Sequence, residues 1–361
     1  MNVQFIDPES PLWQECLAET PHDFYHLPGY LQLCAEREGG SAQAFLADDG
    51  QHRLFVPLII RPVDSSMASP EGLFDATSPY GYPSPLLAGG PSQQSRTAFL
   101  DRALGSLVDA LRERRVVSLF LRLNPLLPLP REPFCHHGTL VHQGETVFVD
   151  LTQSEQEWWR QTRRDHRQHI IRAGQSGWVA EIDQHWEWFD EFFCLYTETM
   201  RRVGADSEYF FPREYFQQLR GALGNGLHLG IVRLGERLAG AGLFSEVCGI
   251  VQYHLAGRRE DKGTPAPMKL LTHFIRGWAK ERGNCVLHLG GGLGAQHDSL
   301  FFYKAGFSSL RGEFFTWRAI VDSDVYQALV AERCRMAESQ DEVADDFFPA
   351  YRRPLLGAQK V

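Results

Sequence analysis

The feature that most constrains the fold is a repeated order of predicted elements in the two halves of the chain. In each half, apolar segments around a turn predict a β-hairpin, an amphipathic segment predicts a helix, and a short apolar run predicts a buried strand. The two series are hairpin 42–60, helix 97–114 and strand 116–123, and hairpin 227–244, helix 267–282 and strand 285–289. This mixed order predicts an α/β (α+β) protein with a structural repeat and argues against a barrel.

The length of the chain sets the number of domains. At 361 residues it exceeds the usual size of a single hydrophobic core, and its 43% hydrophobic content suffices for two. We therefore predict two tandem domains, each a mixed β-sheet flanked by helices, over residues 1–145 and 146–322. A C-terminal helix and tail are expected over residues 323–361.

Composition excludes several classes of protein. A net charge of −9 argues against a general nucleic-acid binder. The seven cysteines are scattered singly, which suits a reducing compartment and provides no zinc framework, so no metal is expected. The first residues do not resemble a signal peptide, and no apolar run is long enough to span a membrane. We expect a cytoplasmic protein without a tightly bound cofactor.

The stretch 285–317 carries the most specific chemistry. Its strand is followed by a glycine run, including Gly291 and Gly292, which permits close approach of a ligand. The segment Asp298–Ala305 then predicts a short amphipathic helix with one charged residue, Lys304, among aromatic residues. Lys304 is either a solvated surface lysine or a cation that neutralises a developing oxyanion or a phosphate.

Two further segments also have two interpretations. Five arginines between residues 160 and 172 are opposed only by Asp165, and they form either a solvated helix face or a basic surface for an anionic ligand. The loop 78–87 is rich in proline and glycine, and it is either a rigid connection or a wall of a pocket that presents Tyr80 and Tyr82. Asp298 is a helix N-cap, a residue that orders the glycine turn, or a proton acceptor.

Several motifs resemble the Fem family of non-ribosomal aminoacyltransferases in the GNAT superfamily. The string from Gly290 through Asp298-Ser-Leu-Phe-Phe-Tyr-Lys304 to Phe307 resembles the signature of that family. Thr199-Met-Arg-Arg202 with Tyr215-Phe216 resembles the segment that lines the acceptor site. Tyr253-His-Leu-Ala256 resembles a strand of the second domain. The resemblance extends to about residue 320 and implies two GNAT-like domains that transfer an acyl or aminoacyl group to an amine.

The resemblance also implies roles for individual residues. The implied donor is an aminoacyl-tRNA, with its acceptor end as partner, or an acyl-CoA. The implied acceptor is the amine of a peptide, a cell-envelope precursor or a small molecule. The candidates are Lys304, Tyr303 and Asp298 for catalysis; Thr199, Arg202, Tyr215, Tyr253, Tyr80 and Tyr82 for substrate binding; and Arg163, Arg167, Arg172, Gly291 and Gly292 for donor binding.

The chain departs from its relatives in two places. Family members that handle murein precursors carry a lysine in the first helix, where this chain has Leu33-Cys-Ala-Glu36. The segment Glu260–Pro265 stands where a CoA-dependent GNAT enzyme has a phosphate-binding loop, and Pro265 lacks the N–H that such a loop uses. The first departure removes an expected nucleotide-contacting cation, and the second argues against a standard CoA site. The alternative hypothesis is a non-catalytic GNAT-like module that binds a peptide or saccharide.

Overall fold

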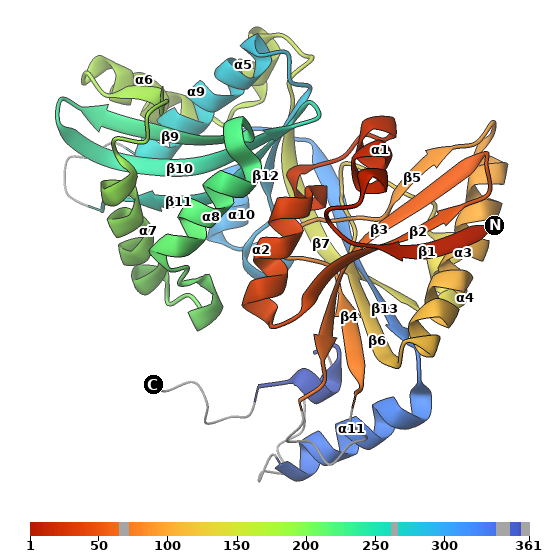
Figure 1. Ribbon diagram of the computed structural model, residues 1–361. Coiled ribbons are helices and arrows are strands. Elements are labelled where there is room, and N and C mark those ends of the chain that lie inside the picture. Colours follow the sequence, from red (N-terminus) through yellow and green to blue (C-terminus); the bar gives the residue numbers. More distant parts are fainter. Residues whose placement is uncertain (65–71, 261–265, 337–346, 355–361) are drawn as a thin grey trace. The chain divides into compact units, whose positions relative to one another are not determined.

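The computed structural model describes residues 1–64, 72–260, 266–336 and 347–354 (Figure 1). The chain forms two compact units. Unit 1 comprises Met1–Gln143 and the described part of Phe314–Val361, and unit 2 comprises Gly144–Glu313. The chain therefore enters unit 2 within strand β7 (Thr139–Asp150) and returns to unit 1 within strand β13 (Arg311–Ile320).

Unit 1 is built on a mixed sheet with the strand order β1-β2-β3-β4-β6-β13, and β5 pairs with β3. Helices α1 and α2 lie on one face of this sheet and α3 and α4 on the other (Figure 1). Helix α3 begins at a capping box, because the Ser92 hydroxyl accepts a hydrogen bond from the Ser95 amide at 3.2 Å. The elements are β1 (Asn2–Ile6), α1 (Pro11–Glu19), α2 (Pro28–Glu38), β2 (Ser41–Asp48), β3 (His52–Pro62), β4 (Phe74–Thr77), β5 (Leu86–Gly89), α3 (Gln93–Glu113), β6 (Val116–Arg122), α4 (Glu132–His137) and α11 (Ser323–Met336).

Unit 2 has its own mixed sheet with the order β7-β12-β11-β10-β9-β8. Helix α9 starts with proline in its first turn and buries Leu271, Ile275 and Ala279 against the sheet. Helices α6 and α9 cover one face, and α7 and α8 the other (Figure 1). The elements are α5 (Glu155–Gln161), α6 (Arg164–Gln175), β8 (Val179–Asp183), α7 (Phe189–Val203), α8 (Arg213–Leu223), β9 (Leu227–Leu234), β10 (Arg237–Val247), β11 (Ile250–Arg258), α9 (Pro267–Glu281), β12 (Val286–Gly290) and α10 (Ser299–Ala305).

The predicted repeat is present in both units. Each unit contains a strand, two helices, a hairpin and a fourth strand, and then a helix that leads to a strand parallel to the fourth one. Apart from β5, which is added before α3 in unit 1, the series run β1-α1-α2-β2-β3-β4-α3-β6 and β8-α7-α8-β9-β10-β11-α9-β12. The α/β class and the tandem arrangement of mixed sheets with flanking helices are therefore confirmed.

The strands that follow the two series along the chain, β7 and β13, are exchanged between the units. Strand β7 follows α4 in the sequence but pairs antiparallel with β12 of unit 2. Strand β13 follows α10 in the sequence but pairs antiparallel with β6 of unit 1.

This exchange gives boundaries that differ from the expected 146–322 and 323–361. Because β13 completes the sheet of unit 1, residues 314–322 belong to that unit. The expected C-terminal helix packs there as well, where Leu329 of α11 forms a small core with Leu73 and Val117.

Candidate active site

The site is built where two parallel strands of unit 2 diverge. Strands β11 and β12 are paired from Ile250 and Val286 to Gln252 and His288. Beyond this point β11 continues to Arg258, whereas β12 ends at Gly290, which has a φ of 76°. A turn through Gly291 and Gly292 follows. In open α/β sheets, the carboxyl ends of parallel strands are the usual place for a ligand.

The turn is tight enough to require glycine at position 292. A Cβ atom there would lie 2.0 Å from the Gln296 carbonyl oxygen and 2.4 Å from Oδ1 of Asp298. Asp298 closes the turn, because its two carboxylate oxygens accept hydrogen bonds from the Leu293 amide at 3.1 Å and the Phe301 amide at 2.8 Å. Asp298 is thus both the N-cap of α10 and the residue that orders the turn.

Lys304 points at this turn. Its Nζ donates a hydrogen bond to the Gly291 carbonyl oxygen at 2.6 Å, so it is not the freely solvated lysine of the first interpretation. Burial lowers the pKa of Lys304 to about 8, and the nearby Asp298 carboxylate opposes that shift. The side chain therefore remains mainly an ammonium at neutral pH, fixed beside the glycine turn.

Tyr303 and Tyr253 both lie in unit 2, and each phenol affects the pKa of the other. The Tyr303 hydroxyl donates to the Met268 carbonyl oxygen at 2.8 Å and lies 2.9 Å from Oγ1 of Thr272, which attaches α10 to the first turn of α9. The Tyr253 ring stacks on Phe244 with centroids 5.1 Å apart. Burial is the main reason that the pKa of each phenol is raised, so both stay protonated.

The predicted acceptor residues of α7 hold the end of β11. The Thr199 hydroxyl donates to the Leu195 carbonyl oxygen at 2.7 Å and accepts from the Arg258 amide at 3.1 Å. Arg202 donates to the Thr199 hydroxyl at 3.2 Å. Tyr215 is only 2% exposed and stacks on Phe211 at 4.2 Å, as a core residue does.

Tyr80 and Tyr82 belong to unit 1. Tyr82 makes edge contacts with the rings of Tyr25 and Phe314, at 5.9 and 5.0 Å between centroids. Tyr80 is 39% exposed, and its carbonyl oxygen accepts from the Tyr30 hydroxyl at 3.0 Å. The loop is thus aromatic on one side and tied to α2.

The arginine-rich segment is largely exposed, but its members differ in their bonding. Arg163 pairs with Asp165 at 2.6 Å, and Arg167 donates to the Trp159 carbonyl oxygen at 3.0 Å. Arg164 and Arg172 are exposed and have no hydrogen-bond or ion-pair partner among the residues that the structure describes. They are therefore free to meet an anion.

Two buried histidines that sequence reasoning did not select support this region. The ring of His166 packs on Gly306, and its Nε2 donates to the Tyr303 carbonyl oxygen at 2.9 Å, so α6 holds the end of α10. Nδ1 of His288 lies 2.7 Å from Oε1 of Gln252 at the last residue pair before β11 and β12 diverge. Burial and then the Lys304 charge lower the pKa of His288 to about 3, which keeps it neutral. His288 was the one polar side chain in a short apolar strand, and that was the available signal.

Two remaining expectations concern the loop before α9 and the membrane. Most of the departure at Glu260–Pro265 falls on residues 261–265, which lie outside the described residues. Within the described parts of the chain, no helix combines the length and apolar character needed to cross a bilayer.

Part of the chain matches a family of known enzymes. Residues 160–304 match the family described as "Acetyltransferase (GNAT) domain", a segment that starts in the arginine-rich region and ends at Lys304. The sequence matches no curated protein. The predicted resemblance to GNAT acyltransferases is thereby confirmed, and the match favours an N-acyltransferase over a non-catalytic module.

Solved structures share the fold over nearly the whole chain. The crystal structure of FemX aligns with a TM-score of 0.66 at 14% identity, over 91% of this chain and 99% of that one. The L-PGS structure from Bacillus licheniformis aligns with a TM-score of 0.54 at 14% identity, over 91% and 97%. The C-terminal domain of a putative lysylphosphatidylglycerol synthetase from Agrobacterium fabrum gives 0.54 at 13% identity, over 90% and 97%.

Proposed function

We propose that this GNAT-type N-acyltransferase is FemAB-like, and that it moves an aminoacyl group from aminoacyl-tRNA to the amine of a peptide, a cell-envelope precursor or a small molecule. The observation that carries the proposal is the Lys304 ammonium, held 2.6 Å from the Gly291 carbonyl oxygen where β11 and β12 diverge. The shared fold with FemX and with lysylphosphatidylglycerol synthetases supports aminoacyl transfer.

The chemistry requires stabilisation of negative charge. The acceptor nitrogen attacks the acyl carbon, and the new C–N bond turns the carbonyl into a tetrahedral oxyanion. When this intermediate collapses, the C–O ester bond to the tRNA breaks, the amine loses a proton and the leaving oxygen gains one. Lys304 supplies a preorganised cation for the oxyanion, and Asp298 and the glycine turn fix its position.

The other candidate residues support these steps. Thr199 and Arg202 hold the end of β11 in place through their hydrogen bonds. The phenol of Tyr253 lies beside that of Tyr303. Tyr303 orients α10 through its hydrogen bond to α9. Tyr80 and Tyr82 belong to unit 1, and their role in substrate binding stays a prediction from the sequence. Tyr215 supports α7 from the core.

The donor is assigned from charge. Arg163, Arg164, Arg167 and Arg172 form a basic surface on and beside α6, and arginine forks suit phosphate oxygens. We assign this surface to the acceptor end of tRNA. Gly291 provides the carbonyl oxygen that holds Lys304, and Gly292 allows the turn to pack against Gln296 and Asp298. An acyl-CoA is the second candidate donor, because the matching family is described by acetyl transfer.

Charge reversal of two unpaired arginines of α6 tests the donor assignment. The double variant Arg164→Glu/Arg172→Glu should weaken binding of a fluorescent aminoacyl-tRNA about tenfold or more at low salt and reduce the salt dependence of binding. The matched control is Arg102→Glu on α3 of unit 1, which should bind tRNA as the wild type does. Unchanged affinity and salt dependence in the double variant, together with transfer from an acyl-CoA, would replace tRNA by CoA as the donor.

A further inference from the structure

A pocket lies on the side of α9 that faces away from the sheet of unit 2. None of the site residues predicted from the sequence lines it. Its volume is about 360 Å³, at the lower end of the roughly 300–1,000 Å³ of small-molecule sites. Gly277 of α9 leaves free space in the pocket, because an added Cβ would meet no atom within 4 Å. We call it the α9 pocket.

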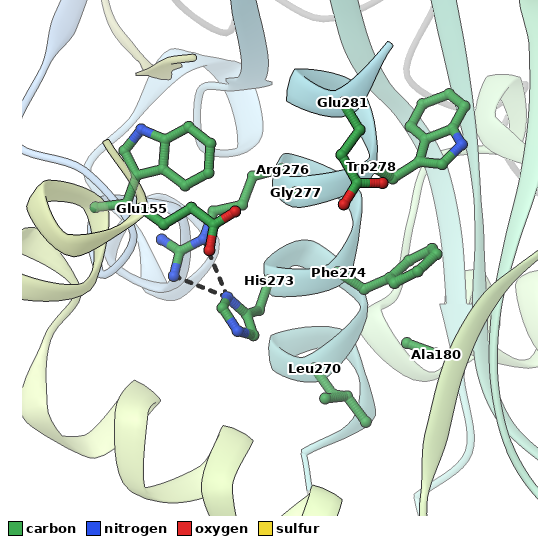
Figure 2. A pocket seen from close by; sticks show the side chains of 10 residues that line it. Glu155, Ala180, Leu270, His273, Phe274, Arg276, Gly277, Trp278 and Glu281 are labelled. Atoms are coloured by element: carbon green, nitrogen blue, oxygen red, sulfur yellow. Dashed lines mark hydrogen bonds between the residues drawn. The ribbon is translucent and has the colours of Figure 1, made fainter. Parts of the chain in front are cut away.

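The two long sides of the α9 pocket differ in chemistry. Figure 2 shows Arg276 and His273 extending from one side of α9 towards Glu155, and Phe274 and Trp278 extending from the other side. The pocket therefore combines a polar side that contains a guanidinium with an aromatic side.

Arg276 is a buried cation, and the Glu155 carboxylate partly opposes the effect of burial on its pKa. Only 1% of the residue is exposed, and burial lowers its pKa to about 10. Its NH1 donates to Oγ1 of Thr162 at 2.9 Å, while Nε and NH2 both reach Nδ1 of His273, at 3.1 and 2.9 Å. No carboxylate forms an ion pair with it in the part of the chain that the structure describes. A guanidinium has five N–H donors, so these contacts leave capacity for an anionic ligand.

A second cation lies near Arg276. The Trp158 ring lies 5.7 Å from the Arg276 guanidinium and 5.2 Å from Nζ of Lys280, so one indole faces two cations. Nζ of Lys280 donates to the carbonyl oxygens of Leu151 and Gln153, and it forms no ion pair with a carboxylate of the described residues. A buried charge is costly unless it is paired, which favours a carboxylate of a ligand beside Arg276.

Two carboxylates also line the pocket. Glu155 and Glu281 line it and are both exposed, and in Figure 2 the Glu281 carboxylate turns towards Gly277. A simple anion would meet these carboxylates on entry. A molecule with an inner carboxylate, an outer ammonium and an apolar group against Phe274 and Trp278 satisfies all three parts of the lining.

We propose that the α9 pocket binds a zwitterionic amino acid with an apolar or aromatic side chain: Arg276 takes the carboxylate, and Glu155 and Glu281 take the ammonium. This site is separate from the proposed transfer reaction and does not depend on it. The same carboxylate chemistry could come from the C-terminal residue of a peptide, which lacks the free ammonium. The ligands used in the test distinguish the two.

Calorimetric titration of the full chain, without donor or acceptor, tests the proposal. L-phenylalanine should bind saturably at millimolar concentration, and L-phenylalanine amide should bind about tenfold to a hundredfold more weakly because it leaves Arg276 without a carboxylate. N-acetyl-L-phenylalanine, which mimics a peptide C-terminus, should be weakened by a similar factor. Equal binding of the N-acetyl compound would contradict the ammonium assignment, and no binding of phenylalanine would overturn the site.

Two variants locate the binding in the pocket. Arg276→Met should abolish binding, and Gly277→Leu should do so by filling the open floor without removing any charge. Gly277→Leu also removes a glycine from a helix interior, so it should fold well. Arg102→Met is the matched arginine control, and Lys304→Met should bind phenylalanine normally. Wild-type affinity in Gly277→Leu would place the ligand elsewhere and refute the proposal.

Discussion

Each unit contains an equivalent pair of parallel strands, but only in unit 2 do the two strands separate after their last paired residues. In unit 1 the pairing of β4 and β6 reaches Thr77 and Phe120. The residue after β4 then remains hydrogen-bonded to β6. The Ser78 amide donates to the Phe120 carbonyl oxygen at 2.9 Å, and the Ser78 hydroxyl accepts from the Arg122 amide at 3.1 Å. In unit 2 the pairing stops at Gln252 and His288.

The difference originates in the residues that follow each second strand. Strand β12 is followed by three glycines, a capping aspartate and a helix that carries Lys304. Strand β6 runs into Leu123, Asn124 and Pro125, where Asn124 Oδ1 accepts from the Leu126 amide at 2.8 Å. One repeat thus gives two outcomes. Unit 2 carries the candidate chemistry, and unit 1 is closed by its own side chains at the equivalent position.

The largest effect is expected at Lys304, which has no lysine counterpart on α4 of unit 1. Lys304→Met should lower kcat about 10²–10³-fold with acceptor affinity nearly unchanged, because one preorganised donor to the oxyanion is lost. Steady-state kinetics measure this. His136→Gln on α4, an exposed residue at 2.8 Å from Asp101, should leave kcat as it is. A Lys304→Met enzyme with normal turnover would remove the chemical distinction between the units.

The glycine turn should give the next largest effect. In Gly292→Ala the new methyl group meets the Gln296 carbonyl oxygen and the Asp298 carboxylate, so the turn must move and carry the Gly291 acceptor of Lys304 with it. Strain of this kind costs about 1–3 kcal/mol, and we expect kcat to fall about tenfold to a hundredfold.

A glycine on a helix provides the control for this variant. Gly221 of α8 has open space around its Cβ position, so Gly221→Ala should leave kcat unchanged and raise the free energy of unfolding by about 0.5–1 kcal/mol. Equal rates for Gly292→Ala and the wild type would show that the tight turn does not position Lys304.

Much of the fold follows from local patterns. The hairpin 227–244, the helix 267–282 and the proline at its start all have local signals, and the structure places β9, β10 and α9 there. The exchange of β7 and β13 has no such signal, because an apolar strand specifies its faces but not its partner. That is why the predicted boundary at residue 322 differs from the observed return to unit 1 at Phe314.

The candidate site could be predicted in part, because only some of its residues lie within recognisable local patterns. Lys304 and Asp298 stand out because a glycine run and a short aromatic helix surround them in sequence. His166 does not, since a buried histidine in a helix looks in sequence like an exposed one, and His288 is marked only as the one polar side chain of its strand. Only tertiary contacts, from His166 to Tyr303 and from His288 to Gln252, give them a role.

The pH dependence sharpens the assignment of Lys304. Its pKa is lowered to about 8, so the ratio of the wild-type rate to the Lys304→Met rate should be constant below pH 8 and fall up to about tenfold per pH unit above it. The ratio cancels the titration of the acceptor amine. A ratio that rises through pH 8 would mean that the neutral amine acts as a base.

The same shift has a consequence for stability with a defined sign. The folded state loses the Lys304 proton near pH 8, whereas the unfolded chain keeps it up to the ordinary lysine pKa of 10.5. Between these values the unfolded state binds more protons, so this residue makes the free energy of unfolding rise with pH. Urea titrations across that range should show the rise in the wild type, and Lys304→Met should lack this contribution.

The smallest effect is expected in unit 1, at the residue that closes its strand pair. Ser78 is fully buried, and Ser78→Ala removes the hydroxyl that accepts from the Arg122 amide. The backbone bond from Ser78 to Phe120 remains. We therefore expect the free energy of unfolding to fall by about 1 kcal/mol and kcat to stay at the wild-type value. If closure of this pair is structural, stability alone responds. A Ser78→Ala enzyme with normal stability but reduced kcat would show that unit 1 takes part in the chemistry at this position, and the contrast between an open and a closed pair would no longer separate function from support.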